Sequence, residues 1–384
     1  MDFGFSQEQE LSRQTARSYL DKECSSPFVR RMLDDPAGTT DDVWQKLAEL
    51  GWLGLIYPEA DGGVGLGFVD LVVILEEMGR VVMPGPFFST VLLGGLAIRE
   101  AGSEAQRREW LPKIAEGAAR VTLALTEEQV GWDPGAVQLA AKPVKGKDGH
   151  WSLSGTKLFV PDAHAADLLV VAARTAKPTK EDAAHGVSLF LVPAGARGVR
   201  TTPLPTMDQT RKLGEVTLAR VEVGPEALLG SLHGGWAPLA RVLDRATVGL
   251  CAEMCGGAQR VLDMCTDYAK MRVAFGKPIG TYQAVKHKCA DMLVGVENAK
   301  SITYYAAWAV DEDVPEARLA ASMAKAYVSD AYRKTAGDGI QIHGGIGFTW
   351  EHDLHLYFKR AKGSEVMFGD ATLHRERVAQ LIDL

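Results

Sequence analysis

The C-terminal third of the chain contains the stretch Arg272-Val273-Ala274-Phe275-Gly276-Lys277-Pro278-Ile279-Gly280-Thr281-Tyr282-Gln283. Apolar residues recur at helical spacing on both sides of it, so we predict that a long helix ends near Arg272 and that another begins near Gln283. A guanidinium at a helix end can bind a pyrophosphate, and a nearby glutamine can bond an adenine or ribityl edge. Taken alone, such a pattern is more often a capped helix end than a ligand site.

A second stretch further along the chain is Gln341-Ile342-His343-Gly344-Gly345-Ile346-Gly347-Phe348. It predicts a tight, glycine-rich turn after a helix. Glycines in such a turn let backbone amides come close to an anion. His343 by itself is more often a structural histidine than a ligand.

Working outward from these stretches, the chain divides into three parts. Residues 6–117 show helical periodicity, and Ser6 is suited to cap the first helix. Residues 120–230 contain short alternating or apolar runs separated by glycine and proline, which predict strands. Helical periodicity returns from Trp236. We therefore expect an α+β fold, with domains at residues 1–118, 119–232 and 233–384. The short strands favour a compact barrel or sandwich over a parallel sheet.

Composition excludes several classes of protein. The 384 residues carry a formal net charge of −7, which argues against a nucleic-acid binder, although a local basic patch for a nucleotide-like ligand is compatible with it. The five cysteines form no CxxC pair, so buried free thiols are expected. No secretory signal, membrane span or metal site is expected, and the default location is cytoplasmic.

A glycine-rich loop at residues 62–67 resembles a phosphate-binding loop only superficially. Its spacing is not the dinucleotide fingerprint, and it lies between helical segments rather than between a strand and a helix. A flexible loop between helices is the better interpretation, and the loop does not indicate NAD.

Taken together, the two C-terminal stretches strongly resemble the acyl-CoA dehydrogenase family. The resemblance extends over nearly the whole chain, through residues 3–9, 54–59, 123–127 and 153–160. It implies an N-terminal helical domain, a middle β-barrel domain and a C-terminal four-helix bundle, which is the order that periodicity predicts.

The resemblance also implies one FAD per subunit, shared across subunits of a dimer of dimers. Residues matching the family's flavin-facing positions are Leu125, Thr126, Phe159 and Val160. Residues matching the positions that reach the dinucleotide of a partner's FAD are Arg272, Phe275, Gln283, Gln341, Gly344 and Gly345. In the family, a base removes a proton from Cα of an acyl-CoA thioester while a hydride passes from Cβ to flavin N5, and an electron-transfer flavoprotein takes the electrons.

The family's catalytic base is missing from both of its usual places. The glutamate that the family carries on the loop before the last helix is replaced by Phe368. The alternative position, on the helix before Arg272, holds Ala246, and the arginine that often follows that base is replaced by Thr247. Neither phenylalanine nor alanine can accept a proton.

Further departures affect the flavin and the substrate. Trp132 stands where a serine commonly contacts flavin or thioester. Pro161 replaces a threonine that commonly contacts flavin N5, and proline has neither a hydroxyl nor a backbone N–H. Asp244 keeps the place of a family aspartate that contacts the pantetheine arm, so CoA recognition is better preserved than catalysis.

Three carboxylates lie close enough in sequence to be substitutes for the base. Glu365 and Asp370 flank Phe368, and Glu253 lies two helical turns beyond Ala246. Each also has a structural interpretation. Glu365 could be solvated, Asp370 could cap the helix starting near Ala371, and Glu253 could be a buried helix residue paired with a neighbour.

Three hypotheses about function remain open. The chain could be one subunit of a heteromeric acyl-CoA dehydrogenase whose homologous partner supplies the base, an arrangement found in the family for bulky steroid CoA esters. It could be a homomeric dehydrogenase with a displaced carboxylate. It could also be a catalytically silent or non-oxidative protein that binds acyl-CoA or flavin. The acyl group depends on residues around Phe87, Phe88 and the helix at residues 239–250, which sequence alone does not place.

Overall fold

Helices, then strands, then helices follow one another along the chain, as periodicity predicts. The structure is a computed structural model that describes residues 4–129 and 131–384. Phe3, which belongs to the family-like stretch at residues 3–9, lies outside the described residues, as do Met1, Asp2 and Val130. The N-terminal helices are α1 (Gln7–Glu23), α2 (Ser26–Asp34), α3 (Asp41–Glu49), α4 (Phe68–Arg80), α5 (Leu96–Ala101) and α6 (Glu104–Ala115), with a π-helical turn at Ser89–Gly95 before α5.

The middle and C-terminal elements complete the fold. The strands are β1 (Val121–Ala124), β2 (Ala140–Pro143), β3 (Trp151–Pro161), β4 (Leu168–Arg174), β5 (Val187–Pro193), β6 (Val199–Leu204), β7 (Leu213–Val223) and β8 (Leu228–Leu229). The last part contains α7 (Trp236–Met271), the short hairpin β9 (Val273–Ala274) and β10 (Lys277–Pro278), α8 (Gln283–Asp311), α9 (Ala317–His343), α10 (Leu354–Val366) and α11 (Ala371–Leu381).

The chain forms two compact units that do not follow the sequence order. One unit takes residues 4–31, Gly67–Met83 and Thr247–Leu384, and the other takes Met32–Leu66 and Pro84–Ala246. The N-terminal helices are therefore divided between the two units.

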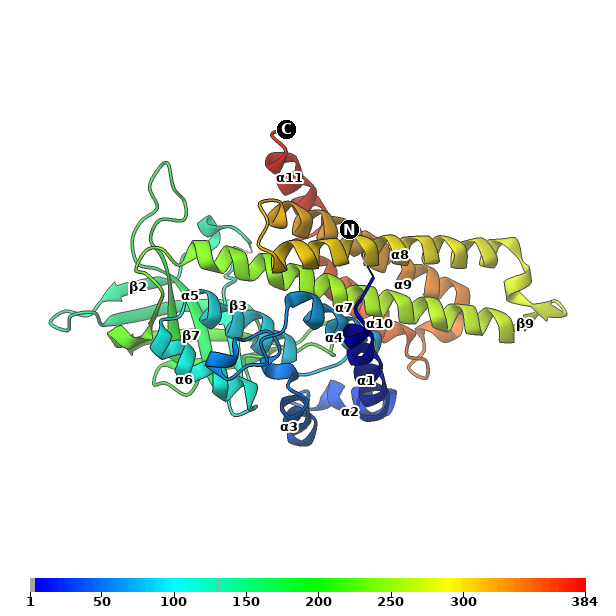
Figure 1. Ribbon diagram of the computed structural model, residues 1–384, viewed down its shortest axis with the longest axis horizontal. Helices are drawn as coiled ribbons and strands as arrows, with labels where there is room; N and C mark the ends of the chain where they lie inside the picture. Colours follow the sequence, from blue (N-terminus) through cyan, green and yellow to red (C-terminus); the bar gives the residue numbers. More distant parts are fainter. Residues whose placement is uncertain (1–3, 130) are drawn as a thin grey trace. The chain divides into compact units, whose positions relative to one another are not determined.

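The first unit is helical. Within it, α9 packs against α8, α10 and α11, and α4 packs against α1 and α8. Figure 1 shows α8 and α9 running alongside the long α7, with the β9 turn beyond the end of α7. Helix α4 also crosses α7 closely. A Cβ added at Gly256 would lie 1.8 Å from the Glu76 carbonyl oxygen, and one added at Gly79 would lie 1.9 Å from the Glu253 carbonyl oxygen. Only glycine allows the two backbones to approach so closely.

The second unit is built on a mixed sheet with the strand order β6-β7-β3-β2-β4-β5-β8, and β1 pairs with β4. The β1–β4 pair is parallel, and most of the other pairs are antiparallel. Apolar side chains such as Leu153, Val160, Val171, Phe190 and Val216 fill its core.

The expected closed barrel is not found. Among the described residues, no pairing joins the two end strands β6 and β8, so the sheet is open. Closure depends on which strands become neighbours, and the strand lengths that favoured a barrel or sandwich do not determine that order.

Several local predictions are confirmed. Ser6 caps α1 through a capping box with Gln9, and Asp370 caps α11. All five cysteines are free, and four of them are buried, whereas Cys289 is half-buried. In the part of the chain that the structure describes, no helix has the length and apolar character needed to cross a membrane.

Candidate functional site

The four residues expected to face the flavin lie in two adjoining segments of the sheet unit. Leu125 and Thr126 directly follow β1, and Phe159 and Val160 lie near the end of β3. The backbone N–H of Leu158 donates to the Thr126 carbonyl at 2.8 Å, and the Thr126 hydroxyl donates to the Leu158 carbonyl. These reciprocal bonds bring the two predicted segments side by side.

An irregularity in β3 presents one aromatic ring at this place. The pairing of β3 with β7 shifts register between Lys157 and Val160. Phe159 lies inside that shift with a φ of 53°, in the left-handed region that non-glycine residues rarely adopt. Its side chain is 46 % exposed, whereas Leu125 and Val160 are buried. The bulge therefore turns Phe159 out of the sheet core as an exposed planar surface.

Three further residues of this unit were singled out in the sequence: Pro161 and Trp132 as departures from the family pattern, and Asp244 as a match to it. Pro161 offers no N–H, and its carbonyl oxygen accepts the Thr122 hydroxyl at 2.6 Å. Trp132 is half-buried in the loop between β1 and β2. Asp244 is half-buried on α7.

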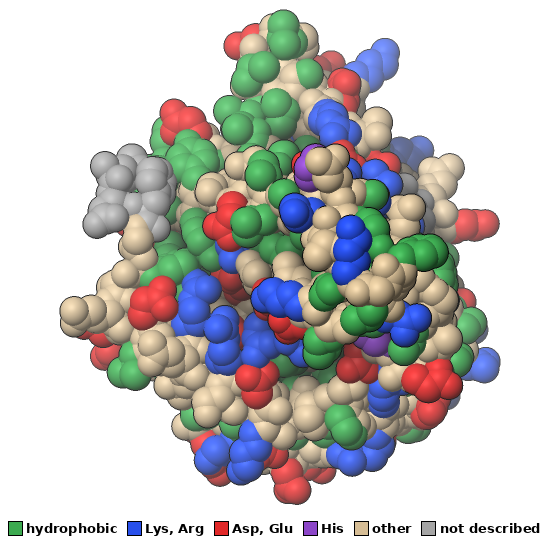
Figure 2. Space-filling view, turned by 90° about the vertical axis from the view of Figure 1, so that its right-hand side faces the viewer, with side chains coloured by type: hydrophobic (Ala, Val, Ile, Leu, Met, Phe, Trp, Pro, Cys, Tyr) green, Lys and Arg blue, Asp and Glu red, His purple; other side chains and the backbone are tan. Residues whose placement is uncertain are grey.

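The hairpin after α7 displays the first C-terminal motif. Helix α7 ends at Met271 and α8 begins at Gln283, as the sequence predicts. Phe275 has a φ of 52° and is 96 % exposed, and the following Gly276 has a φ of 79°. Arg272 and Gln283 are both exposed. Figure 2 looks onto this face of the molecule and shows Lys and Arg side chains gathered beside hydrophobic ones.

The second motif lies at the same end of the helical unit. His343, the last residue of α9, stacks on Tyr268 near the end of α7, with ring centroids 4.3 Å apart. Gly344 and Gly345 follow directly, and Gly344 has a φ of 63°. Gly344 and Gly345 therefore begin next to a side chain that packs on the last turns of α7, the helix that leads to the first motif. His343 is buried and bonds the Gly339 carbonyl, which agrees with its structural interpretation.

The residues present in these turns suit an anionic dinucleotide. Arg272 forms no ion pair with any described residue, so its guanidinium is available to a phosphate. A Cβ added at Gly344 or Gly345 would meet nothing within 4 Å, which leaves open space beside the backbone. Cationic and amide donors beside an open glycine turn are the groups that bind a diphosphate.

Both usual places for the base are apolar and buried. Ala246, in the sheet unit, has no exposed surface, and Phe368, in the helical unit, is 4 % exposed. Phe368 has a φ of 60°, which a phenylalanine adopts only when its surroundings impose it.

The three alternative carboxylates all have structural partners. Glu365 forms ion pairs with Arg333 at 3.1 Å and Lys362 at 2.6 Å. Asp370 accepts the Leu373 backbone N–H at 2.8 Å as the cap of α11. Glu253 is buried with its carboxylate 3.7 Å from the Arg360 guanidinium. Asp370 and Glu253 therefore have the structural roles that the sequence left open, whereas Glu365 is half-buried between two cations rather than solvated.

Sequence reasoning missed a buried lysine that holds the Phe368 loop. Lys325 has no exposed surface, and its ammonium donates to the carbonyls of Ser364, Glu365 and Gly369 at 2.9–3.1 Å. On the other side of the loop, His374 Nε2 donates to the Phe368 carbonyl at 3.0 Å. Burial lowers the pKa of His374 to about 4, and the Lys325 charge adds to that shift. A lysine within an alanine-rich helical face was the available signal.

It also missed Lys157, which contacts a segment that is expected to face the flavin. Lys157 has no exposed surface, and its ammonium donates to Glu127 Oε1 at 2.7 Å and to the Leu125 carbonyl at 2.9 Å. Leu153 and Lys157 share the inward face of β3, so a charged residue in an otherwise apolar position was the signal.

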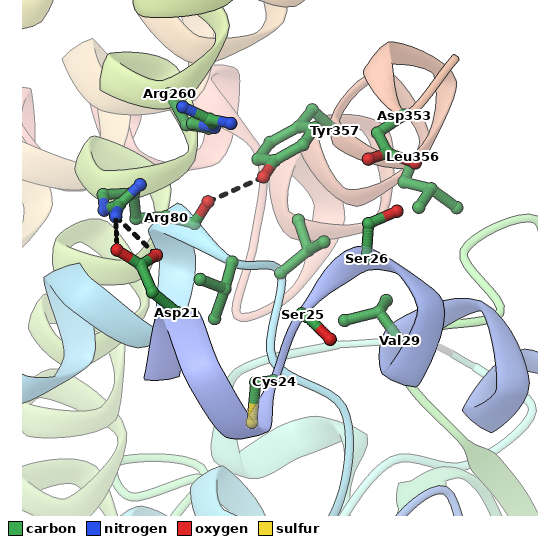
Figure 3. A pocket seen from close by; sticks show the side chains of 12 residues that line it. Asp21, Cys24, Ser25, Ser26, Val29, Arg80, Arg260, Asp353, Leu356 and Tyr357 are labelled. Carbon is green, nitrogen blue, oxygen red and sulfur yellow. Dashed lines mark hydrogen bonds and ion pairs between the residues drawn. The ribbon is translucent and has the colours of Figure 1, made fainter. Parts of the chain in front are cut away.

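A separate cavity in the helical unit does not belong to this site. It has a volume of about 190 Å³ and lies among the ends of α1 and α4, the start of α2, and α7 and α10. Its wall carries Arg80 and Arg260 against Asp21 and Asp353, and Arg80 is paired with Asp21 at 2.6 Å (Figure 3). The opposing charges are balanced, and none of the motif residues lines it.

Comparison with known proteins gives one family for all three parts of the chain. Family models described as the N-terminal, middle and C-terminal domains of acyl-CoA dehydrogenase match residues 6–118, 122–221 and 233–382, respectively.

Similar individual proteins include a curated sequence and two solved structures. Acyl-CoA dehydrogenase IpdE2 of Mycolicibacterium smegmatis is 32 % identical over 365 residues, which are 95 % of each chain. The Tcur3481–Tcur3483 steroid ACAD is 32 % identical with a TM-score of 0.87, and 98 % of each chain is covered. The ChsE4–ChsE5 complex from Mycobacterium tuberculosis contains a chain that is 26 % identical with a TM-score of 0.89, over 100 % of this chain and 99 % of the other.

Proposed function

Because the chain belongs to the acyl-CoA dehydrogenase family of FAD-dependent oxidoreductases, we propose that it is one subunit of a heteromeric acyl-CoA dehydrogenase whose homologous partner supplies the catalytic base. The reaction is the α,β-dehydrogenation of an acyl-CoA thioester.

One observation carries this proposal. Phe368 and Ala246 place buried apolar side chains at both positions where the family keeps its base, while the two C-terminal stretches, Arg272 to Gln283 and Gln341 to Gly345, keep the family's residues. General base catalysis needs a proton acceptor within hydrogen-bonding reach of Cα, and neither side chain offers one. A partner with the family's carboxylate would complete the chemistry.

This chain's contribution is to bind and orient. When bound, FAD supplies the hydride acceptor. Thr126 and Phe159, with Leu125 and Val160, would form the wall beside the isoalloxazine ring, and Trp132 would line its edge. The residues that would bind the dinucleotide of a partner's FAD are Arg272, Phe275, Gln283, Gln341, Gly344 and Gly345. Asp244 would bind the pantetheine arm of the acyl-CoA.

The assembly that follows is a dimer of dimers. The proposed domains are residues 1–118, 119–232 and 233–384, and the family-model ranges 6–118, 122–221 and 233–382 support this division. Within the last domain, α7–α10 would form the family's four-helix bundle. The exposed Phe275 and Phe348, which are 96 % and 72 % exposed, would be covered by another subunit.

The substrate and the electron acceptor follow from the relatives. A steroid ACAD and a two-component complex lie among the similar structures, so a bulky CoA ester such as a steroid derivative is the proposed substrate. An electron-transfer flavoprotein is the proposed acceptor, and the cytoplasm is the proposed location.

The homomeric alternative has less support. Glu365 and Glu253 each already pair with a cation, and Asp370 already caps a helix. Using one of them as the base would require breaking those contacts.

The test compares the chain purified alone with the chain co-purified with its homologue. Flavin content is measured first, and then flavin absorbance is followed without oxygen after adding butyryl-CoA, octanoyl-CoA or a steroid CoA ester. We expect rapid bleaching with the co-purified pair and none with the chain alone. Rapid bleaching by the chain alone would refute the proposal in favour of a homomeric enzyme.

A further inference from the structure

Lys157 and Glu127 form a buried ion pair directly beneath the flavin-facing segments. The Lys157 side chain has no exposed surface, and the Glu127 side chain is 13 % exposed. Their charged atoms lie 2.7 Å apart. The same ammonium donates to the Leu125 carbonyl at 2.9 Å, so Lys157 bonds the residue just before Thr126.

Glu127 extends the contact to a third segment. The same oxygen, Oε1, accepts the backbone N–H groups of Gln138 and Leu139, each at 2.9 Å. Glu127, which follows β1, therefore links two other segments through one carboxylate oxygen: Lys157 of β3 and the residues just before β2. The flavin-facing Thr126 and Phe159 each lie within two residues of a member of the pair.

Stability alone does not explain why this ion pair is buried. Burial lowers the pKa of Lys157 to about 8; the Glu127 carboxylate opposes that shift, and the Arg174 guanidinium adds to it. Taking both charges out of water costs more than an apolar pair of similar volume would cost. The charged groups that face Lys157 are Glu127, after β1, and Arg174, on β4. Buried pairs of this kind are best explained by the geometry that they impose.

We propose that Lys157 and Glu127 are a positioning pair for the flavin ring. The pair holds Thr126 and the Phe159 bulge in fixed positions against the ring. This inference rests on the proposed function, since it requires that these segments face FAD. The pair touches no reacting atom and acts through the backbone of Leu125 and through the bulge. Loosening it lets the ring shift against its wall, which changes both the affinity for FAD and the flavin spectrum.

The experiment uses the complex of the full-length chain with its homologue, and compares Lys157→Met with Lys147→Met. Lys147 pairs with Glu222 at 2.8 Å in the same β domain, but both side chains are 53 % exposed. It is a matched control, because it removes an equal charge without touching the flavin-facing segments. The measurements are the dissociation constant of FAD, the position of the flavin band between pH 7 and 9, and the melting temperature.

We expect Lys157→Met to weaken FAD binding at least tenfold and to displace the flavin band. The band of the wild-type complex should shift near pH 8, where Lys157 loses its proton, and the band of the variant should not. Lys147→Met should leave all three properties unchanged. The double variant Lys157→Met with Glu127→Gln removes the unpaired buried carboxylate, so it should recover melting temperature while the flavin band stays displaced. If the flavin properties recover together with the melting temperature, the pair is merely structural and the inference is wrong.

The outcomes separate this inference from the proposed function. A wild-type complex that binds no FAD refutes the proposed function. A wild-type complex that binds FAD, with a Lys157→Met variant of unchanged affinity and spectrum, refutes the positioning pair alone.

Discussion

Gly256→Ala adds a methyl group at the point where α7 crosses α4. The new Cβ would lie 1.8 Å from the Glu76 carbonyl oxygen and 2.9 Å from the Arg80 backbone nitrogen, whereas ordinary van der Waals contact begins at 3.4 Å. The obstructing atoms are backbone, so no side chain can rotate away. The helices must separate by roughly 1.5 Å, and Glu253 and Gly79, which make the reciprocal contact, would move as well.

The magnitude follows from two opposing terms. Overpacking of a core costs about 1–3 kcal/mol and occasionally more, and a backbone obstacle puts this site at the upper end or above it. Alanine regains about 1 kcal/mol of helix propensity over glycine. We expect a net loss of about 3 kcal/mol, which lowers the melting temperature of a protein of this size by on the order of 5 °C.

Gly295→Ala is the matched control. Gly295 is also in a helix, α8, but a Cβ there would meet nothing within 4 Å. The same substitution should therefore raise stability by about 0.4–1 kcal/mol. The two variants are compared by thermal melting of the FAD-loaded protein. A Gly256→Ala melting temperature equal to or above that of Gly295→Ala would contradict the close helix crossing.

Three further predictions concern charged groups. Arg272→Gln removes a proposed charge-assisted bond to phosphate worth about 1.5–3 kcal/mol, so it should weaken FAD binding about ten- to a hundredfold in a fluorescence titration. The control Lys270→Gln, in the last turn of α7, should have little effect. Equal effects of the two variants would argue against a phosphate-binding role for Arg272. Lys325→Met leaves three carbonyls without their donor and should lower the free energy of unfolding by about 3 kcal/mol in denaturant titration, whereas a loss below 1 kcal/mol would show that the loop does not depend on it. The pKa of Lys157 falls from 10.5 to about 8 on folding, so between pH 8 and 10.5 the folded state binds fewer protons than the unfolded state. The contribution of Lys157 to the free energy of unfolding therefore rises with pH across that window, by up to about 3 kcal/mol. Lys157→Met should flatten that rise, and an unchanged pH profile of melting temperature would contradict the shift.

Local sequence signals predicted the ends of the helices well. The helical spacing of apolar residues predicted the end of α7 near Arg272. A cap of α11 by Asp370 was one of the alternatives that the sequence offered, because capping depends on residues three apart. The helical–β–helical order followed from periodicity for the same reason.

Contacts between distant residues were outside the reach of those signals. Lys157 pairs with Glu127 thirty residues earlier, and Glu253 faces Arg360 from another helix. Sheet closure was mispredicted because strand order is a long-range property, and the open order found here is set by which strands pair rather than by their lengths. The motifs gave the candidates for flavin binding, which stay predictions, and only the fold shows which residues surround these candidates in space.

The central claim is that the proton acceptor belongs to the partner subunit. The most direct measurement is the rate of anaerobic flavin reduction by the acyl-CoA substrate in the assembled complex. Replacing the partner's catalytic carboxylate by its amide should lower that rate at least a thousandfold, whereas Glu365→Gln with Asp370→Asn in this chain should leave it within a factor of two. A collapse of the rate caused by the changes in this chain, with the partner's change tolerated, would contradict the account.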